Sequence, residues 1–406
     1  QAPTPLKVFV RGVEEGNRLT AWINRYTPPQ LQAAEERDLL SPLFPSMDIV
    51  NFAGIILSLL AIVFGYDAIC GEKERGTLRL MLSYSVPRDR LLLAKWIGGY
   101  VSLVIPFLLA VLGGAALVLV QPEFSLTAAQ WIKLALVIGL ALVYLAAMYW
   151  MVLWVSCLTS RSATSVLILA TIWLVFVMVI PNVSPYLARA LRPTRNPLEM
   201  EIARSSASRA MQSEVDEKMK AYEVAHGLGD NWRDKIDRSQ WDQREKAEAW
   251  YLQRAKIQGS ASLVCLDNFA RLDESFQKEL DSQVSLSRWI SRLSPFSCFA
   301  TFASEITDTG VLGKRRFLDQ IRAYQRTVIA YGFDEWTGVQ EYVLDHKGET
   351  KPWIEIRKKP VPIFVYVPSA GSDYLREVMV DVGLIAGAAV IFFMLSYLAF
   401  LRYDVR

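Results

Sequence analysis

Five long apolar stretches stand out in a chain that otherwise mixes polar and apolar residues. A helix needs roughly 20 apolar residues to cross the hydrocarbon core of a bilayer, because its backbone amides must then bond within the segment. The pattern predicts spans at about Ile49 to Tyr66, Trp96 to Val120, Trp131 to Leu158, Thr164 to Pro181 and Val380 to Leu401. The fold class that follows is an α-helical polytopic membrane protein.

The polar segment 182–379, between the fourth and fifth spans, has a different pattern. Residues 181–185 and the pair Arg192-Pro193 are expected to break the fourth helix. Beyond them, apolar residues recur at helical spacing, which predicts long amphipathic helices. These helices are expected within 198–285, with a turn at 227–231, and then at 293–306 and 315–331. A large, mostly helical domain is therefore expected here.

The end of this segment favours extended structure. Residues 353–357 and 361–367 are rich in β-branched and aromatic residues, while Pro360 and Pro362 confine any strand to a short or edge position. We expect a small β element, either a sheet or an extended arm near the membrane. At the other end of the chain, residues 19–37 have helical spacing, and we expect the segment 1–48 to pack beside the arm.

Composition narrows the class by exclusion. Hydrophobic residues make up 52% of the 406, which excludes intrinsic disorder, and four cysteines are too few for a disulfide scaffold. The formal net charge is only +3, so nucleic acid is not expected as a partner. A membrane protein remains.

Basic residues in the short connections predict the orientation, since Lys and Arg resist translocation. They are Lys73, Arg75, Arg79, Arg88, Arg90 and Lys95 between the first two spans, Arg161 after the third, and Arg402 and Arg406 in the tail. These segments are expected to be cytoplasmic, in a bacterial inner membrane. The expected organisation is an extracytoplasmic segment 1–48, spans 49–181 with a cytoplasmic hairpin 67–95, a periplasmic or extracellular domain 182–379, and a last span with a cytoplasmic tail, 380–406.

This orientation raises a question about the N-terminus. Five spans and a cytoplasmic C-terminus require an external N-terminus, yet the residues after Gln1 do not have the pattern of an export signal. Either a cleaved signal peptide or a further span preceded Gln1. We favour the further span, since six spans suit the pattern better than five.

The hairpin 67–95 is the most informative segment. It begins as a charged helical extension, in which Leu78, Met81 and Leu82 can lie on one face. Pro87 restricts Val86 to extended geometry and can open a second short helix, which leads into the second span. On charge pattern alone, the hairpin is either a solvated positive loop or a compact knob tied to two membrane helices.

A family resemblance favours the compact knob. Glu72-Lys73-Glu74-Arg75-Gly76-Thr77-Leu78 followed by Ser85-Val86-Pro87-Arg88 resembles the signature after the second span of ABC type-2 transporter permeases. The resemblance implies a coupling helix that docks on an ATP-binding subunit and transmits closure of the ATPase dimer. The residues that it implies for coupling are Ser83, Tyr84, Ser85, Val86, Pro87, Arg88, Asp89 and Arg90. Those that it implies for a charged gate helix beneath the pore are Glu72, Glu74, Arg75, Gly76 and Thr77, with Gly76 allowing close backbone approach.

The exterior segment carries a second resemblance. The order Ser294-Pro295, Thr309-Gly310 and Arg316-Phe317 before a final span is similar to large-ectodomain permeases grouped with the copper-enzyme-maturation branch of this family. Together the two resemblances cover most of the chain after residue 48.

The search for catalytic chemistry gives little. The sequence has no GxxxxGK[ST] phosphate loop, so we expect no cofactor on this chain, with ATP and Mg²⁺ on a partner. His226 and His346 lie on separate segments away from other metal-ligand residues, which disfavours a metal site and puts copper handling in doubt. Cys265 and Cys298 are expected outside, where they either pair or lie buried in helices.

The spans carry little internal charge. Ion-coupled carriers keep ionisable groups at depth, whereas Lys133, Asp381 and Asp67 lie near the predicted span ends. The driving energy is therefore expected to come from a partner. Small residues, including the pair Gly98-Gly99, are expected to allow close helix contacts, and Pro106 is a candidate kink.

The function that this pattern favours is the membrane-spanning permease subunit of an ABC exporter. The expected partners are a cytoplasmic ATP-binding subunit in two copies, a second permease that is identical or homologous, the lipid bilayer and a periplasmic protein. A membrane-anchored sensor or scaffold, whose exterior domain binds a ligand while no solute crosses, is the alternative.

Overall fold

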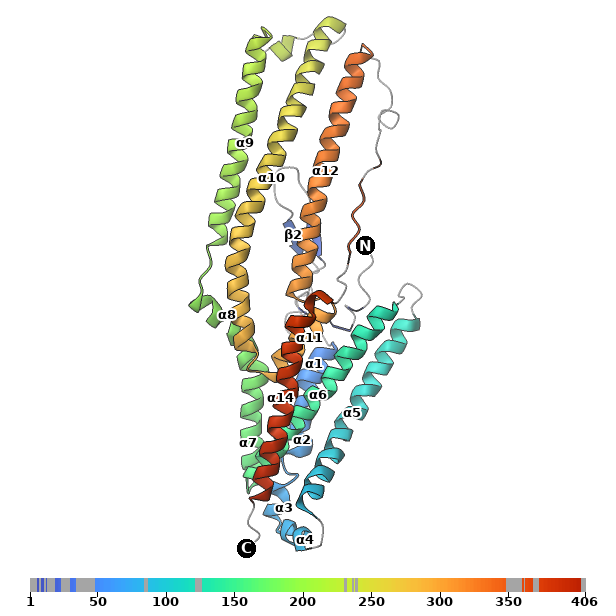
Figure 1. The fold of residues 1–406 in the computed structure, drawn as a ribbon, viewed down its shortest axis with the longest axis vertical. Helices are drawn as coiled ribbons and strands as arrows, with labels where there is room; N and C mark the ends of the chain where they lie inside the picture. Colours follow the sequence, from blue (N-terminus) through green and yellow to red (C-terminus); the bar gives the residue numbers. More distant parts are fainter. Residues whose placement is uncertain are drawn as a thin grey trace.

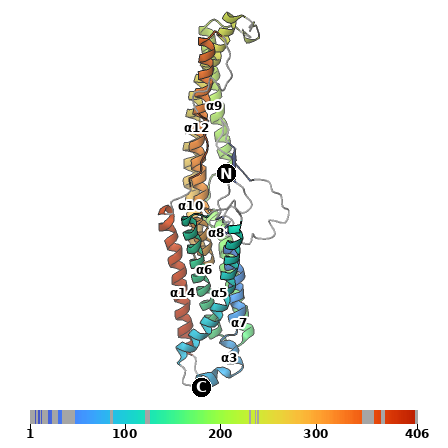
Figure 2. The same ribbon diagram turned by 90° about the vertical axis from the view of Figure 1, so that its right-hand side faces the viewer.

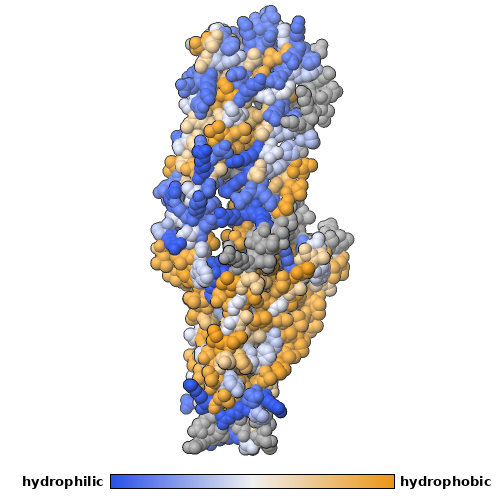
Figure 3. All heavy atoms as spheres, viewed as in Figure 1, coloured by the Kyte–Doolittle hydropathy of each residue, from blue (hydrophilic) through white to orange (hydrophobic). Residues whose placement is uncertain are grey.

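The computed structural model describes residues 6, 9–10, 12, 19–22, 30–33, 48–83, 87–120, 126–229, 232–235, 237, 240–347, 360, 362–367 and 372–402. The molecule is long and narrow, with a bundle of apolar helices at one end and three long helices projecting from it (Figures 1 and 2). Apolar side chains cover the bundle on the face shown in Figure 3, and polar side chains cover much of the projecting part. This division corresponds to the separation of apolar and polar segments in the sequence.

Five helical segments of the described chain are long and apolar enough to cross a membrane, at the five predicted places. The first consists of α1 (Ile49–Asn51), the π-helical segment η4 (Phe52–Leu57) and α2 (Ser58–Gly65), and a turn leads from it to α3 (Cys70–Glu74). The second and third are α5 (Arg88–Val120) and α6 (Ala128–Leu158). The fourth consists of α7 (Ser162–Trp173), the π-helical η5 (Leu174–Val179) and α8 (Ile180–Leu191), and the fifth lies in α14 (Ser372–Leu401). The predicted fold class is confirmed, and α5 continues unbroken through Pro106.

The fourth span is longer than expected, because the prolines at 181 and 185 do not end it. Proline lacks the amide that bonds to the carbonyl four residues earlier. The π-helical η5 ends two residues before Pro181. The Ser184 hydroxyl donates to the Pro181 carbonyl oxygen at 3.2 Å, where Pro185 supplies no amide. The helix therefore continues to Leu191 and ends just before Pro193.

The helices α9 (Pro197–Ala225), α10 (Trp241–Ser291) and α12 (Val311–Asp345) form the projecting part and are called the projecting helices below. A short 3₁₀ turn, η6 (Trp232–Lys235), lies between α9 and α10. The helices share an apolar core that includes Val215, Trp250, Phe269 and Ile329. Asp273 of α10 is buried and accepts hydrogen bonds from Arg204 of α9 and Arg322 of α12, so one carboxylate joins all three helices.

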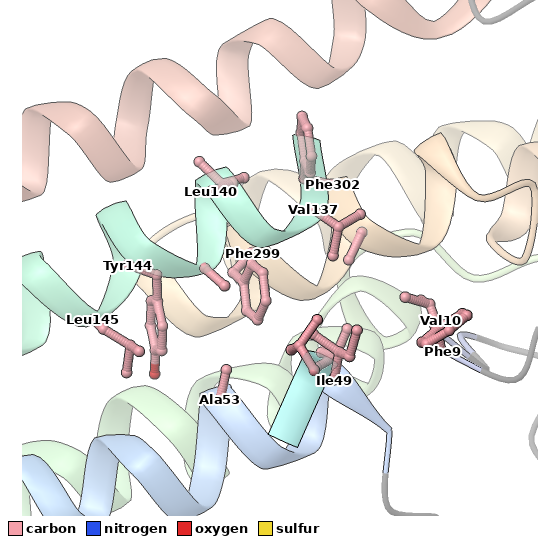
Figure 4. Close-up of a cluster of buried hydrophobic side chains, with 14 of the residues drawn as sticks. Phe9, Val10, Ile49, Ala53, Val137, Leu140, Tyr144, Leu145, Phe299 and Phe302 are labelled. Carbon is pink, nitrogen blue, oxygen red and sulfur yellow. The ribbon is translucent and has the colours of Figure 1, made fainter. Parts of the chain in front are cut away.

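Helix α11 (Pro295–Ile306) does not project, and packs instead within the end of the bundle from which α10 and α12 rise. The Phe299 ring stacks on the Tyr144 ring of α6, with 5.4 Å between their centroids, and Phe302 is also buried (Figure 4). Ser294 caps the helix through the Ser297 amide, and its hydroxyl also donates to the Phe176 carbonyl oxygen in η5. Helix α11 therefore packs against the first, third, fourth and fifth spans.

The β structure lies elsewhere than expected. Strands β1 (Leu19–Trp22) and β2 (Gln30–Ala33) pair antiparallel, so the helix expected over 19–37 is wrong: the segment alternates apolar and polar residues around a connection instead of presenting one helical face. Of the two alternatives expected at the end of the polar segment, a small sheet or an extended arm, the described residues form the arm. Residues 362–367 are extended without strand pairing, and 353–357 lie outside the described residues.

The extended segment 362–367 is an arm that packs along α12. Tyr324 donates to the Pro362 carbonyl oxygen at 3.0 Å, and the Gln320 amide bonds to both the N–H and the carbonyl of Val367. Side-chain bonds from α12 thus replace a strand partner, which is why aromatic and β-branched residues occur here without a sheet.

The two cysteines that the sequence places outside, Cys265 and Cys298, do not pair. Cys265 is buried among the projecting helices and Cys298 in the bundle core, and both are free thiols. Burial raises the pKa of the Cys265 thiol, which keeps it protonated and unreactive. Helical burial, the other alternative, is the one that the structure supports.

Gly99 allows α5 and α6 to pack closely, whereas its neighbour Gly98 faces open space. A Cβ atom at 99 would overlap the hydroxyl and ring of Tyr149, which is buried on α6. Replacing Gly99 with Ala should therefore destabilise the protein by about 1–3 kcal/mol, the usual cost of overpacking. The measurement is the unfolding temperature in detergent, which should fall for Gly99→Ala and not for Gly98→Ala. Equal melting of the two variants would contradict this packing.

Candidate functional site

The hairpin 67–95 lies at the end of the bundle opposite the projecting helices, with the C-terminal end of α14 beside it (Figure 1). Its first helix, α3, begins at a buried serine that belongs to another span. The Ser156 hydroxyl of α6 accepts hydrogen bonds from the Ile69 and Cys70 amides, both at 3.0 Å. The first amides of a helix have no partner within the helix, so the α6 side chain stabilises the start of α3.

Lys73 of α3 binds the C-terminal end of α6. Its ammonium group donates to the carbonyl oxygens of Cys157 and of Thr159, the latter at 3.1 Å. The last carbonyls of a helix are unpaired and carry partial negative charge, which a cation offsets. A lysine at this place therefore bonds α3 to the end of the third span.

Glu74 directly follows Lys73 and carries the opposite charge. It binds the N-terminal end of α7. One carboxylate oxygen accepts from the Ser162 amide at 2.9 Å and from the Ser162 hydroxyl at 2.7 Å. The chain turns back between α6 and α7 within residues 159–161, so a helix C-terminus and a helix N-terminus lie close together. Adjacent positive and negative side chains match these two ends with the sign that each requires.

Glu72 connects α3 to the second span. Its carboxylate accepts from the Lys95 ammonium group of α5 at 3.1 Å and from the Thr77 hydroxyl. Arg75 is 3.9 Å from the same carboxylate and its side chain is exposed, so this ion pair contributes little.

Arg88, at the start of α5, connects the second half of the hairpin to the fifth span. Its guanidinium donates to the Leu401 carbonyl oxygen, at the C-terminal end of α14, at 2.8 Å. With the bonds of α3, the hairpin is joined to α5, α6, α7 and α14.

Gly76 separates α3 from α4 (Thr77–Ser83) and has a φ of 75°, a conformation that favours glycine. The expectation that Gly76 allows close backbone approach is wrong, since a Cβ there would meet no atom within 4 Å. The charged extension is therefore two short helices, and α4 turns back so that Leu78 packs, buried, in a core with Leu92 of α5.

The residues predicted for docking are placed as follows. Ser83, Pro87, Asp89 and Arg90 are exposed, Arg88 is half-buried, and Tyr84, Ser85 and Val86 lie outside the described residues. The separate helix expected after Pro87 is instead the first turns of α5, which continues into the second span. Of the gate residues, Glu72, Glu74 and Thr77 make the bonds described above.

Sequence reasoning missed Lys73, Ser156 and Ser162. Their partners lie more than 80 residues away or are backbone carbonyls, which leave no trace in a local pattern. One signal was available: Ser156 is a polar residue within an apolar helix, and such residues usually bond across a helix interface.

Nowhere in the described part of the chain do three or more His, Cys, Asp or Glu side chains gather in a way that would hold an ion. The geometry instead suits mechanical work, because a force on the hairpin acts on four spans at once.

A sequence model of the family described as "ABC-2 family transporter protein" matches residues 27–405. The chain belongs to the ABC-2 transporter family. The resemblance seen in residues 72–88 is thus confirmed at the level of the family.

Two curated relatives are similar over shorter stretches. A protein of Pseudomonas aeruginosa named "Probable ABC transporter permease protein NosY" is 41% identical over 69 residues, which are 17% of this chain and 25% of that protein. The protein of the same name in Stutzerimonas stutzeri is 42% identical over 50 residues, 12% of this chain and 18% of that protein. These matches span a quarter or less of the relatives' length.

Replacing the Ser156 hydroxyl tests whether its hydrogen bonds hold the start of α3 in this ABC-2 transporter. Replacing it with Ala leaves the Ile69 and Cys70 amides buried without an acceptor, at a cost of about 1–3 kcal/mol for each such group. Amide hydrogen exchange in residues 66–76 should accelerate at least about tenfold. Ser102→Ala is the matched control, since Ser102 is exposed and its hydroxyl donates to the Gly98 carbonyl of its own helix. Unchanged exchange in Ser156→Ala would show that α3 is held in another way.

Proposed function

We propose that this ABC-2 transporter chain is the permease subunit of an exporter, driven by a separate ATP-binding subunit that docks on residues 83–90. The single observation that carries the proposal is the bonding of the hairpin to four spans through Glu72, Lys73, Glu74, Arg88 and Ser156. A docked motor would need such a connection to move the membrane helices. The exposed Ser83, Pro87, Asp89 and Arg90 supply a surface on which it can act.

The hairpin faces the cytoplasm in this proposal. The structure brings the basic segments 67–95 and 159–161 and residue Arg402 to the same end of the bundle, as the positive-inside rule requires for a cytoplasmic end. The tail is then cytoplasmic, and the projecting helices extend into the periplasm or the extracellular space of a bacterium.

The assembly that we propose contains two ATP-binding subunits, which hold ATP and Mg²⁺, and a second permease, identical or homologous. Apolar side chains on α5 face outward, including Leu109 and Leu117, which are 65% and 73% exposed. Lipid and the second permease would cover this face. The projecting helices would bind a periplasmic protein or the exported substrate.

Charge reversal on the docking surface tests the proposal. Arg90→Glu should lower the amount of ATP-binding protein that copurifies in mild detergent at least about tenfold, since like charges at an interface are strongly unfavourable. Arg402→Glu makes the same charge change on an exposed residue at the same end of the bundle and should leave copurification unchanged.

Two results would count against the proposal. If Arg90→Glu retains as much ATP-binding protein as Arg402→Glu, the partner docks elsewhere. If the unaltered protein repeatedly purifies without such a partner, the sensor or scaffold function is favoured instead.

Cysteine labelling tests the orientation. All four native cysteines are buried, so a membrane-impermeant maleimide should report mainly on introduced sites. Val224→Cys, at an 80% exposed position near the end of α9, should react in intact spheroplasts. Leu80→Cys, at a 60% exposed position of α4, should react only in inside-out vesicles. The reverse pattern would place the hairpin outside and leave it unable to meet an ATPase.

A further inference from the structure

Helix α14 is bonded at both ends of its membrane-spanning part. At the projecting end, Asp381 is fully buried and accepts from Arg292 at 2.7 Å and from Arg288 at 3.1 Å. Arg288 lies on the last turn of α10, and Arg292 directly follows that helix. At the other end, the Leu401 carbonyl accepts from Arg88 of the hairpin. The 20 residues between these bonds extend about 30 Å, the thickness of the hydrocarbon core.

Helix α6 is bonded in the same way. Near its start, the Lys133 ammonium group lies 3.0 Å from the Asp308 carboxylate, in the turn between α11 and α12. Near its end, Ser156 and the last carbonyls bind α3. Each of these two packed spans therefore joins the hairpin to the root of a different projecting helix: α14 to α10, and α6 to α12.

This arrangement amplifies small displacements. Packed helices lie about 10 Å apart, so a 1 Å slide of α14 along α6 would tilt the projecting helices by about 0.1 radian. Helix α10 has 51 residues and a length of about 75 Å, so its far end would move about 7 Å. Contacts among the projecting helices, including Asp273 with Arg204 and Arg322, favour their movement as one body.

We propose that Asp381, Arg288 and Arg292 are positioning residues that convert movement of the hairpin into tilting of the projecting helices. The inference rests on the proposed function, because an ATP-binding subunit must move the hairpin. The far end of the projecting helices then moves at each nucleotide cycle, and it displaces the substrate or periplasmic protein held there.

The chemistry of the Asp381 cluster suits this role. A buried ion pair adds little net stability compared with apolar residues, but separating its partners is costly, because a charge would be left without a counter-charge. Arg288 donates to one oxygen of the Asp381 carboxylate, and Arg292 donates to the other. The contact therefore resists sliding in either direction, which an apolar contact would allow.

The test uses the complex of the full chain with its copurifying ATP-binding subunit. Spin labels at Leu167→Cys of α7 and Val224→Cys of α9 report the position of the projecting helices, and labels at Leu167→Cys and Leu80→Cys report the hairpin. These three positions are 68%, 80% and 60% exposed. Electron–electron distances are measured without nucleotide and with Mg²⁺-ATP trapped by vanadate.

In the unaltered background, nucleotide should shift both distances, with a change of several ångströms at Val224. Asp381→Asn should keep the hairpin shift and ATP hydrolysis but lose the Val224 shift, and Asp381→Glu should restore it. If Asp381→Asn does not fold, Arg292→Lys keeps the charge but not the forked donor geometry and should at least halve the Val224 shift. Asp267→Asn is the matched control, since Asp267 pairs with Arg326 between α10 and α12 on the exposed surface and should leave both shifts intact.

Two outcomes would overturn the inference alone. The first is a normal Val224 shift in Asp381→Asn, or in Arg292→Lys where Asp381→Asn does not fold. The second is a hairpin shift without any Val224 shift in the unaltered background. A complex that hydrolyses ATP without moving the hairpin would instead overturn the proposed function, and this inference with it.

Discussion

Helix ends are the constraint on which this structure depends. A helix that stops at a membrane boundary leaves amides or carbonyls without partners, and each one that stays buried costs free energy. In this chain, side chains from other helices supply the missing partners: Ser156 at the start of α3, Lys73 at the end of α6, Glu74 at the start of α7 and Arg88 at the end of α14. The bonds that satisfy these backbone groups therefore also join the third, fourth and fifth spans to the hairpin.

Much of the fold follows from the sequence because it depends on lengths and periods. The five spans, the bounds of α11 and the long helices of the polar segment each follow from one local pattern, and the structure confirms them. The errors have local causes too. The prolines in α8 were expected to end the helix, but the helix continues through both, and the Ser184 hydroxyl bonds to the carbonyl that Pro185 leaves without an amide. The arm 362–367 has the composition of a strand, but α12 supplies its hydrogen bonds.

The site was only half accessible to sequence reasoning, for a physical reason. The charges of residues 72–75 were evident, and the family signature marked them, but a charge pattern does not say what each charge binds. Lys73 and Glu74 act on two helix ends that become neighbours only when α6 and α7 turn back on each other. Asp381 was placed near a span end but without its partners, because Arg288 and Arg292 lie about 90 residues earlier, in a segment that the sequence assigns to the exterior.

The position of α11 limits how this chain can act. Phe299 and Phe302 fill the bundle between the first and third spans. Ser294, at the start of α11, bonds to η5, and Asp308, in the turn after α11, bonds to α6. A solute path through the middle of one chain would require α11 to leave a close-packed apolar core, at a large cost in free energy. A path between two permeases, or work done by the projecting helices, leaves that core intact. The packing of α11 thus favours a transporter whose single chain moves as a set of rigid, bonded rods and does not open from within.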